Sequence, residues 1–174
     1  MPKAVKLYVR YVDAMSRVVG RFAMYMIFAM IGLLLYSSIT KTFFLPVIWT
    51  LELAQFSMAA YYLLGGAYSM QLDAHVRMDL LYSRWSSKGK GFTDSITSFC
   101  LVFYLAILLY GGFSSTAYAL QYGETSYSSW SPLMAPIKIV MAFGIALMLL
   151  QAVATFFRDL ARARGLSLDE ETPA

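Results

Sequence analysis

The sequence predicts an all-α integral membrane protein with four transmembrane helices and both termini in the cytoplasm. The main observation is that four stretches of 19, 20, 29 and 19 residues contain no Asp, Glu, Lys or Arg. These stretches lie between Arg21 and Lys41, between Glu52 and Asp73, between Asp94 and Glu124, and between Lys138 and Arg158. A helix needs about 20 apolar residues to cross roughly 30 Å of hydrocarbon, so each stretch is long enough for one span.

Composition and charge distribution support this fold class. Of the 174 residues, 59% are hydrophobic, and no segment outside the spans reaches the roughly 50 residues of a small soluble domain. Twelve of the 14 basic residues precede the first stretch, lie between the second and third, or follow the fourth; only Lys41 and Lys138 do not. This positive-inside bias places both termini in the cytoplasm and accounts for the net charge of +4 without a nucleic-acid partner.

The N-terminal segment, residues 2–21, is predicted to form a basic amphipathic helix. Its apolar side comprises Val5, Tyr8, Val9, Val12, Met15, Ser16 and Val19, and its charged side comprises Lys3, Lys6, Arg10, Asp13, Arg17 and Arg21. We expect this helix to lie along the inner leaflet with its apolar side in lipid, and the chain to turn into a first span at residues 22–40. The alternative is an irregular basic end that only sets the topology.

The other elements follow in order along the chain. A second span is expected at residues 50–71, a cytoplasmic connection at 73–91, a third span at 95–123, a fourth at 137–157 and a cytoplasmic tail at 158–174. The first half of the connection is predicted to form a second interfacial helix, and its Ser- and Gly-rich second half a turn. The third span has 29 uncharged residues, about 44 Å of helix, so it must tilt or project beyond the bilayer.

Small residues recur every fourth position along the third span. They are Gly111, Ser115, Ala119 and Gly123, and such a stripe lets another helix approach closely. The neighbour is either another span of this chain or another polypeptide. Cys100, in the same span, is predicted to be a small core residue.

The polar residues of the spans offer little chemistry of their own. One histidine and one cysteine cannot supply the ligands of a haem, an iron–sulfur cluster or a zinc site, so we expect no cofactor and no enzymatic activity. Glu52 is the only acid near a span, about one turn into the second, with Gln55 on the same face. It is interpreted as an interface group, as a solvated residue, or as the coupling site of a stand-alone ion-coupled exporter.

Four segments together resemble the small membrane subunit, of DctQ type, of tripartite ATP-independent periplasmic (TRAP) transporters. They are Trp49-Thr-Leu-Glu52-Leu-Ala-Gln55-Phe56, Gly65-Gly-Ala-Tyr68, His75-Val-Arg77-Met-Asp79-Leu80, and Glu124 to Trp130 with Pro132. The resemblance covers nearly the whole chain. It implies a scaffold subunit of the bacterial inner membrane that braces a large elevator-type subunit during sodium-coupled uptake of a small organic acid delivered by a periplasmic binding protein.

Two sets of contact residues follow from the resemblance and from the placement of its segments. His75, Arg77 and Asp79 are expected to fix the inner end of span two, through ion pairs to this chain's first helix, to lipid phosphate or to the large subunit. The alternative is that these charges only close i, i+4 pairs and mark the membrane border. The outer set, which faces the large subunit and the docked binding protein, is Glu52, Gln55, Glu124 and Trp130. The runner-up is the small four-helix subunit of tricarboxylate-type tripartite transporters, which has the same division of labour.

Overall fold

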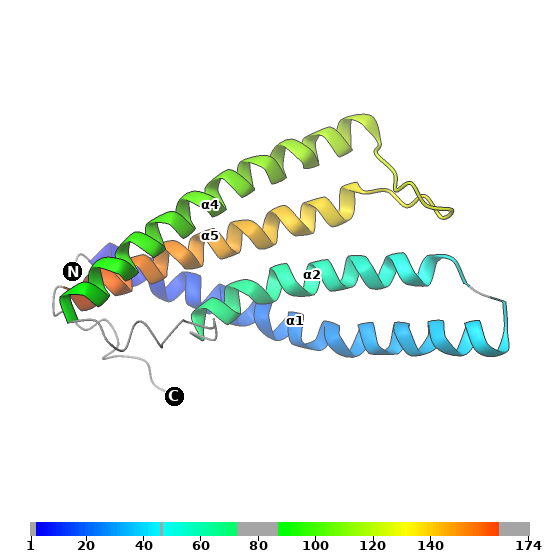
Figure 1. Ribbon diagram of the computed structural model, residues 1–174, viewed down its shortest axis with the longest axis horizontal. Coiled ribbons are helices and arrows are strands. Elements are labelled where there is room, and N and C mark those ends of the chain that lie inside the picture. The colour runs from blue at the N-terminus through cyan, green and yellow to red at the C-terminus, as the bar shows by residue number, and fades with distance from the viewer. Residues whose placement is uncertain (1–2, 46, 73–86, 164–174) are drawn as a thin grey trace.

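The part of the chain that the structure describes folds as four long α-helices. The computed structural model describes residues 3–45, 47–72 and 87–163. In these ranges the helices are α1 (Lys3–Phe43), α2 (Trp49–Gln71), α4 (Ser87–Tyr122) and α5 (Ala135–Ala163). The first residue of α1 and the last of α5 lie at the same end of the molecule (Figure 1). The predicted all-α class is confirmed.

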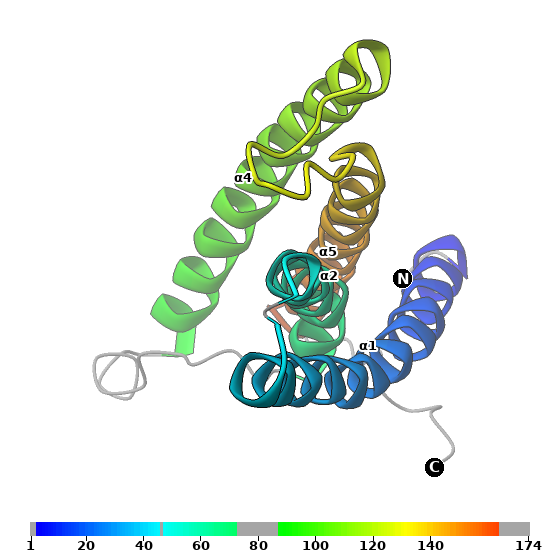
Figure 2. The ribbon, with the colours of Figure 1, turned by 90° about the vertical axis from the view of Figure 1, so that its right-hand side faces the viewer.

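The helices do not form a closed four-helix bundle: α1, α2 and α5 contact one another, and α4 is attached at one side of this group. α2 packs between α1 and α5, α1 also reaches α5, and α4 packs extensively against α5 alone. Figure 2 shows α4 standing on the outer side of α5, away from α1. Most of the circumference of α4 is therefore not covered by the rest of the described chain.

The first helix is continuous where a turn was expected. α1 runs for 41 residues without interruption, so residues 3–21 and the first span belong to one helix. Its length of about 62 Å is twice the thickness of the hydrocarbon core. Figure 2 shows that α1 changes direction by curving along its length, and no helix break is present in it.

The apolar side of the N-terminal half of α1 packs against protein, and the expectation that this side faces lipid is wrong. Val9 and Val12 form a buried cluster with Ala154 of α5, and Val5, Tyr8 and Leu150 pack around them. The next turns of α1 reach a second cluster, which consists of Ala23, Leu64, Ala67 and Leu147. The C-terminal half of α5 supplies a complementary surface that a single-helix pattern in the sequence does not reveal.

Among the described residues, three helices are long and apolar enough to cross a membrane. The qualifying segments are Val5–Phe43, Ile96–Tyr122 and Ala135–Arg158. α2 has 23 residues and is not among these segments. It lies between two neighbours, and its buried residues are mostly small: Thr50, Ala54, Ala60, Leu64 and Ala67. Its role as a fourth span stays a prediction.

The last two helices are longer than the spans predicted within them. α4 begins at Ser87, so residues 87–91, expected in the connecting turn, are helical. α5 extends from Ala135 to Ala163 and so includes the first residues of the predicted tail. Cys100 is exposed on α4 and is not a core residue, because α4 has only one extensive neighbour to bury it.

Candidate subunit-interface site

A polar network joins the start of α1 to the end of α5. Asp13 forms an ion pair with Arg158, and its other carboxylate oxygen accepts a hydrogen bond from the Gln151 side chain at 3.0 Å. Gln151 in turn accepts a hydrogen bond from the Ser16 hydroxyl at 2.9 Å. Ser16 and Gln151 are both fully buried. Every member of the network therefore has a partner, which is the condition under which a buried polar group does not destabilise a fold.

Tyr8 extends this attachment toward the N-terminus. Its hydroxyl donates to the carbonyl of Leu150 at 3.1 Å, and its ring meets that of Phe157 edge-on at 6.4 Å. The two helices are thus joined over about two turns by hydrogen bonds, an ion pair and aromatic packing. These polar groups are engaged in holding α1 to α5, so they are not available to bind a solute or an ion.

At the opposite end of the molecule, residues of the connection between α4 and α5 form hydrogen bonds with one another and with the helix ends. Gly123, with a φ of +61°, ends α4, and the amide of Glu124 donates to the carbonyl of Ala119 at 3.2 Å. This is the hydrogen bond of a glycine-terminated helix, in which the glycine adopts the left-handed conformation. Gly123 therefore ends the helix, although the sequence pattern places it in the small-residue stripe.

The same connection is held in shape by bonds across its base. Thr125 and Leu133 form an isolated antiparallel bridge. Glu124 forms an ion pair with Lys138 at the start of α5, so the Glu124 carboxylate is engaged within its own chain. The side chain of Trp130 is exposed, as is that of Tyr127. The aromatic tip of the connection is therefore open to a partner, whereas its base is not.

The outer end of the α1–α2 pair carries the first of the predicted interface residues. The hydroxyls of Ser37 and Thr50 share a hydrogen bond of 3.0 Å, and the rings of Tyr36 and Trp49 stack with their centroids 6.0 Å apart. One turn further along α2, a carboxylate oxygen of Glu52 is buried but has no hydrogen-bond partner among the described residues. Gln55, the next residue predicted on this face, is exposed.

The residues of the predicted small-residue stripe of α4 differ in burial. Ala119 is buried, whereas Gly111 and Ser115 are exposed, and no heavy atom lies within 4 Å of a Cβ placed on Gly111. The face of α4 that packs on α5 overlaps the predicted stripe only at Ala119. It comprises Leu105, Gly112, Thr116 and Ala119. Thr116 also donates to Gly112 O at 2.7 Å and to Lys138 O at 3.3 Å.

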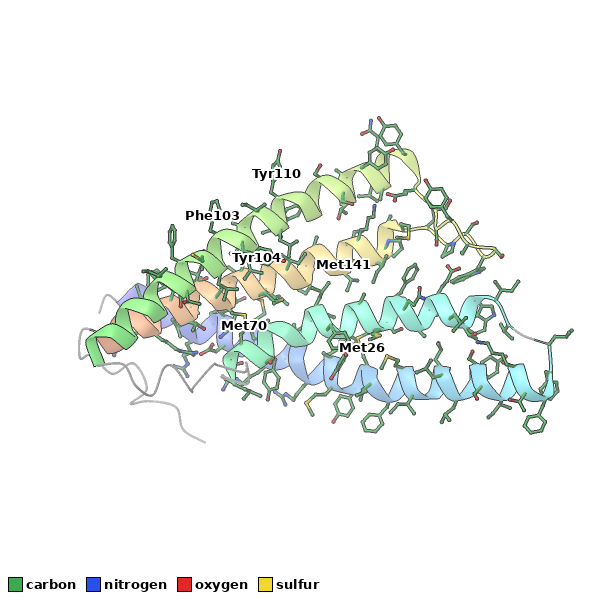
Figure 3. All side chains as sticks on the ribbon, in the orientation of Figure 1. Met26, Met70, Phe103, Tyr104, Tyr110 and Met141 are labelled. Carbon is green, nitrogen blue, oxygen red and sulfur yellow. The ribbon has the colours of Figure 1, made fainter. Side chains whose placement is uncertain are left out.

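The remaining sides of α4 expose large apolar and aromatic residues. Figure 3 shows Phe103 and Tyr110 projecting away from the other helices, and their exposed fractions are 61% and 79%. Others along the helix are Ile96, Phe99, Tyr104, Ile107, Phe113, Tyr118, Leu120 and Tyr122. A surface of this kind needs lipid or another protein to cover it.

Three of the predicted residues lie outside the described residues, and three residues of the polar network were not predicted. His75, Arg77 and Asp79 belong to the first group. Asp13, Gln151 and Arg158 belong to the second: none of them was predicted as a site residue. A signal for them existed, because Asp13 is the only acid of α1 and Gln151 is the only amide in α5.

These features define a class of protein, a helical membrane subunit whose polar side chains mainly fasten its own helices together. The described residues contain no group of three or more His, Cys, Asp or Glu side chains that could hold a metal ion. The sequence model of the family described as tripartite ATP-independent periplasmic transporters, DctQ component, matches residues 30–162.

Because the match covers most of the chain, the protein belongs to this family and is a small membrane subunit of a TRAP transporter. Members are transporter subunits, not enzymes, and work with a large membrane subunit and a binding protein. No curated protein matches the chain, and no solved structure matches it.

Proposed function

We propose that the chain is the scaffold subunit that braces the large elevator-type subunit of its transporter during sodium-coupled uptake of a small organic acid delivered by the periplasmic binding protein. The observation that carries this proposal is the limited attachment of α4, which among the described residues packs extensively on α5 only and exposes large apolar side chains from Ile96 to Tyr122. A helix attached on one side offers its other sides to a second membrane protein.

The open side of α4 around Gly111 and Ser115 is the proposed contact with the large subunit. Both residues are small and exposed, so a helix of the partner can approach the α4 backbone closely there. Association of helices within a membrane depends on such packing, because burial of apolar surface gives little net gain in lipid. Glu52 and Gln55 are proposed to add hydrogen bonds, since a buried oxygen of Glu52 lacks a partner within the described chain.

The outer connection is proposed to meet the large subunit or the docked binding protein through Trp130. The carboxylate of Glu124 is already paired with Lys138, so its contribution is to keep the connection in shape. A crosslinking survey from Trp130 and Tyr127 tests this contact. Absence of crosslinks to both partners would refute it.

The segment with His75, Arg77 and Asp79 is proposed to fix the inner end of α2, by ion pairs to α1, to lipid phosphate or to the large subunit. The proposed setting is the bacterial inner membrane, crossed four times, with the basic ends of the helices in the cytoplasm. The distribution of 12 basic residues against two supports this orientation. Membership of the TRAP family favours this function over that of a tricarboxylate-type subunit.

The test is complementation of a strain that lacks the small subunit, with two measurements: uptake of the captured solute and recovery of the large subunit in a pull-down. Gly111→Leu and Arg77→Gln should lower both, while solute capture by the binding protein stays unchanged. Ala117→Leu, at an exposed position on another side of α4, and Lys41→Gln, an exposed charge at the end of α1, are the matched controls.

Three results would overturn the scaffold proposal. They are normal uptake and complex recovery in both variants, equal losses in variants and controls, and transport by the purified small subunit alone in liposomes. The last result would favour the stand-alone exporter.

A further inference from the structure

The N-terminal half of α1 has a basic face that the fold leaves open. Lys6, Arg10, Arg17 and Arg21 are all exposed and follow one another at intervals of four, seven and four residues. At 100° per residue, they fall within about 60° of one another around the helix. We call these four residues the basic stripe.

An exposed apolar stripe runs directly beside the basic stripe. Each of its members follows a basic residue by one position: Leu7, Tyr11, Val18 and Phe22, with exposed fractions of 63% to 73%. This second apolar side is distinct from the one that packs on α5, where Val9, Val12 and Ser16 are buried. The segment thus has three sides, one against protein, one basic and one apolar but open.

The one acid of α1 is paired with residues of α5 and does not neutralise the basic stripe. Asp13 is the only acidic residue of the helix, and its two oxygens are engaged by Arg158 and Gln151 of α5. Among the described residues, no member of the basic stripe forms an ion pair with an acid. Within the described residues, the four positive charges of the basic stripe are therefore not neutralised by an acid.

The length of the basic stripe constrains how it meets a membrane. From Lys6 to Arg21 the helix rises about 22 Å, whereas the headgroup layer on each side of a bilayer is only about 5 to 8 Å deep. All four side chains can reach phosphates only if this part of α1 lies inclined to the membrane. Figure 2 shows that α1 curves over its length, so its N-terminal part does not follow the direction of its C-terminal part.

We propose that the basic stripe and the apolar stripe beside it bind anionic phospholipid, with the headgroup phosphates on the basic stripe and the acyl chains along the apolar one. The occupant follows from charge complementarity and from continuity with the candidate span Val5–Phe43. Three of the four basic residues are arginines, whose guanidinium groups bind phosphate through two parallel hydrogen bonds. The long side chains reach the headgroups while their stems stay in apolar surroundings.

The test measures lipid selectivity next to α1 in the full chain. A reporter variant carries Tyr11→Trp, and Trp49, Trp85 and Trp130 are replaced by Phe. It is reconstituted in bilayers of phosphatidylglycerol and phosphatidylcholine, with either lipid brominated. The ratio of the two quenching efficiencies gives the relative association constant. We expect phosphatidylglycerol to be preferred, and each Arg→Gln change at Arg10, Arg17 or Arg21 to lower the preference by up to about fivefold.

Two controls separate lipid binding from a change of fold. Arg17→Lys keeps the charge and should keep most of the preference, and Lys41→Gln removes a charge at the far end of α1 and should leave it unchanged. Equal association of the two lipids, or a preference that survives substitution of all four basic residues, would overturn the proposal. So would loss of the preference on co-reconstitution with the large subunit, because the basic stripe would then face that protein. The scaffold function does not depend on these outcomes.

Discussion

The close crossing of α2 and α5 depends on a glycine, and adding one methyl group there tests the packing. In Gly144→Ala, the new Cβ would lie 2.9 Å from the Cβ of Leu63, 3.1 Å from its carbonyl carbon and 3.2 Å from its carbonyl oxygen. Two of these three atoms are backbone, so a change of side-chain rotamer cannot relieve the contact. The helices must separate instead.

The magnitude follows from two opposing terms. Replacing glycine by alanine within a helix stabilises it by about 1 kcal/mol. Overpacking a tightly packed site costs about 1 to 3 kcal/mol. Gly65→Ala is the matched control, since no heavy atom lies within 4 Å of the methyl group that it adds. We therefore expect Gly144→Ala to be less stable than Gly65→Ala by about 1 to 3 kcal/mol.

A third variant makes the comparison sharper. At Gly66 the added methyl meets the flexible end of Met148, with the sulfur at 2.9 Å, and that side chain is able to move. From most to least stable, the expected order is Gly65→Ala, Gly66→Ala and Gly144→Ala. The assay is unfolding by dodecyl sulfate in mixed micelles, followed by far-ultraviolet circular dichroism. Equal midpoints for Gly65→Ala and Gly144→Ala would refute the close crossing of α2 and α5.

Two further predictions concern the attachment of α1 to α5. Asp13→Asn leaves Arg158 without its ion-pair partner. The side chains of Asp13 and Arg158 are only 13% and 21% exposed. We therefore expect a loss of stability of about 2 to 3 kcal/mol, between the values for exposed and buried pairs. The double variant Asp13→Asn/Arg158→Gln should lose less than the sum of the single variants, and additive losses in the same unfolding assay would show that the two residues do not interact. Tyr8→Phe removes the hydrogen bond to Leu150 but keeps the ring against Phe157, so we expect a loss of about 1 kcal/mol; a wild-type midpoint would argue against that hydrogen bond.

Features set by residues close in the sequence were predictable, and features set by residues far apart in the sequence were not. The helical regions followed from charge-free stretches and helical periodicity, which are local signals. The partner of each helix face did not follow, because the apolar side of residues 5–19 is equally suited to lipid and to protein. The positions of Gln151 and Ala154 on α5 are what place this side against protein, and they are not visible in the local sequence.

The candidate site shows the same limit. The spacing of Gly111, Ser115 and Ala119 is correct as a pattern, yet only Ala119 is buried within the chain, because the packed face is centred on Leu105, Gly112 and Thr116. A period of four residues drifts around a helix that repeats every 3.6 residues, so one stripe passes from an open face to a packed one. Sequence spacing alone could not locate that change.

The pairing of Asp13 with Arg158 has a consequence for synthesis, because the two residues are 145 positions apart. At 5 to 20 residues per second, roughly 7 to 30 s pass between the emergence of the two side chains from the ribosome. During that interval Asp13 and Ser16 have none of their partners on α5, so water or lipid headgroups must supply equivalent hydrogen bonds. The beginning of α1 is therefore not fastened to α5 until the last helix has been made, whereas the following turns of α1 can pack against α2 much earlier.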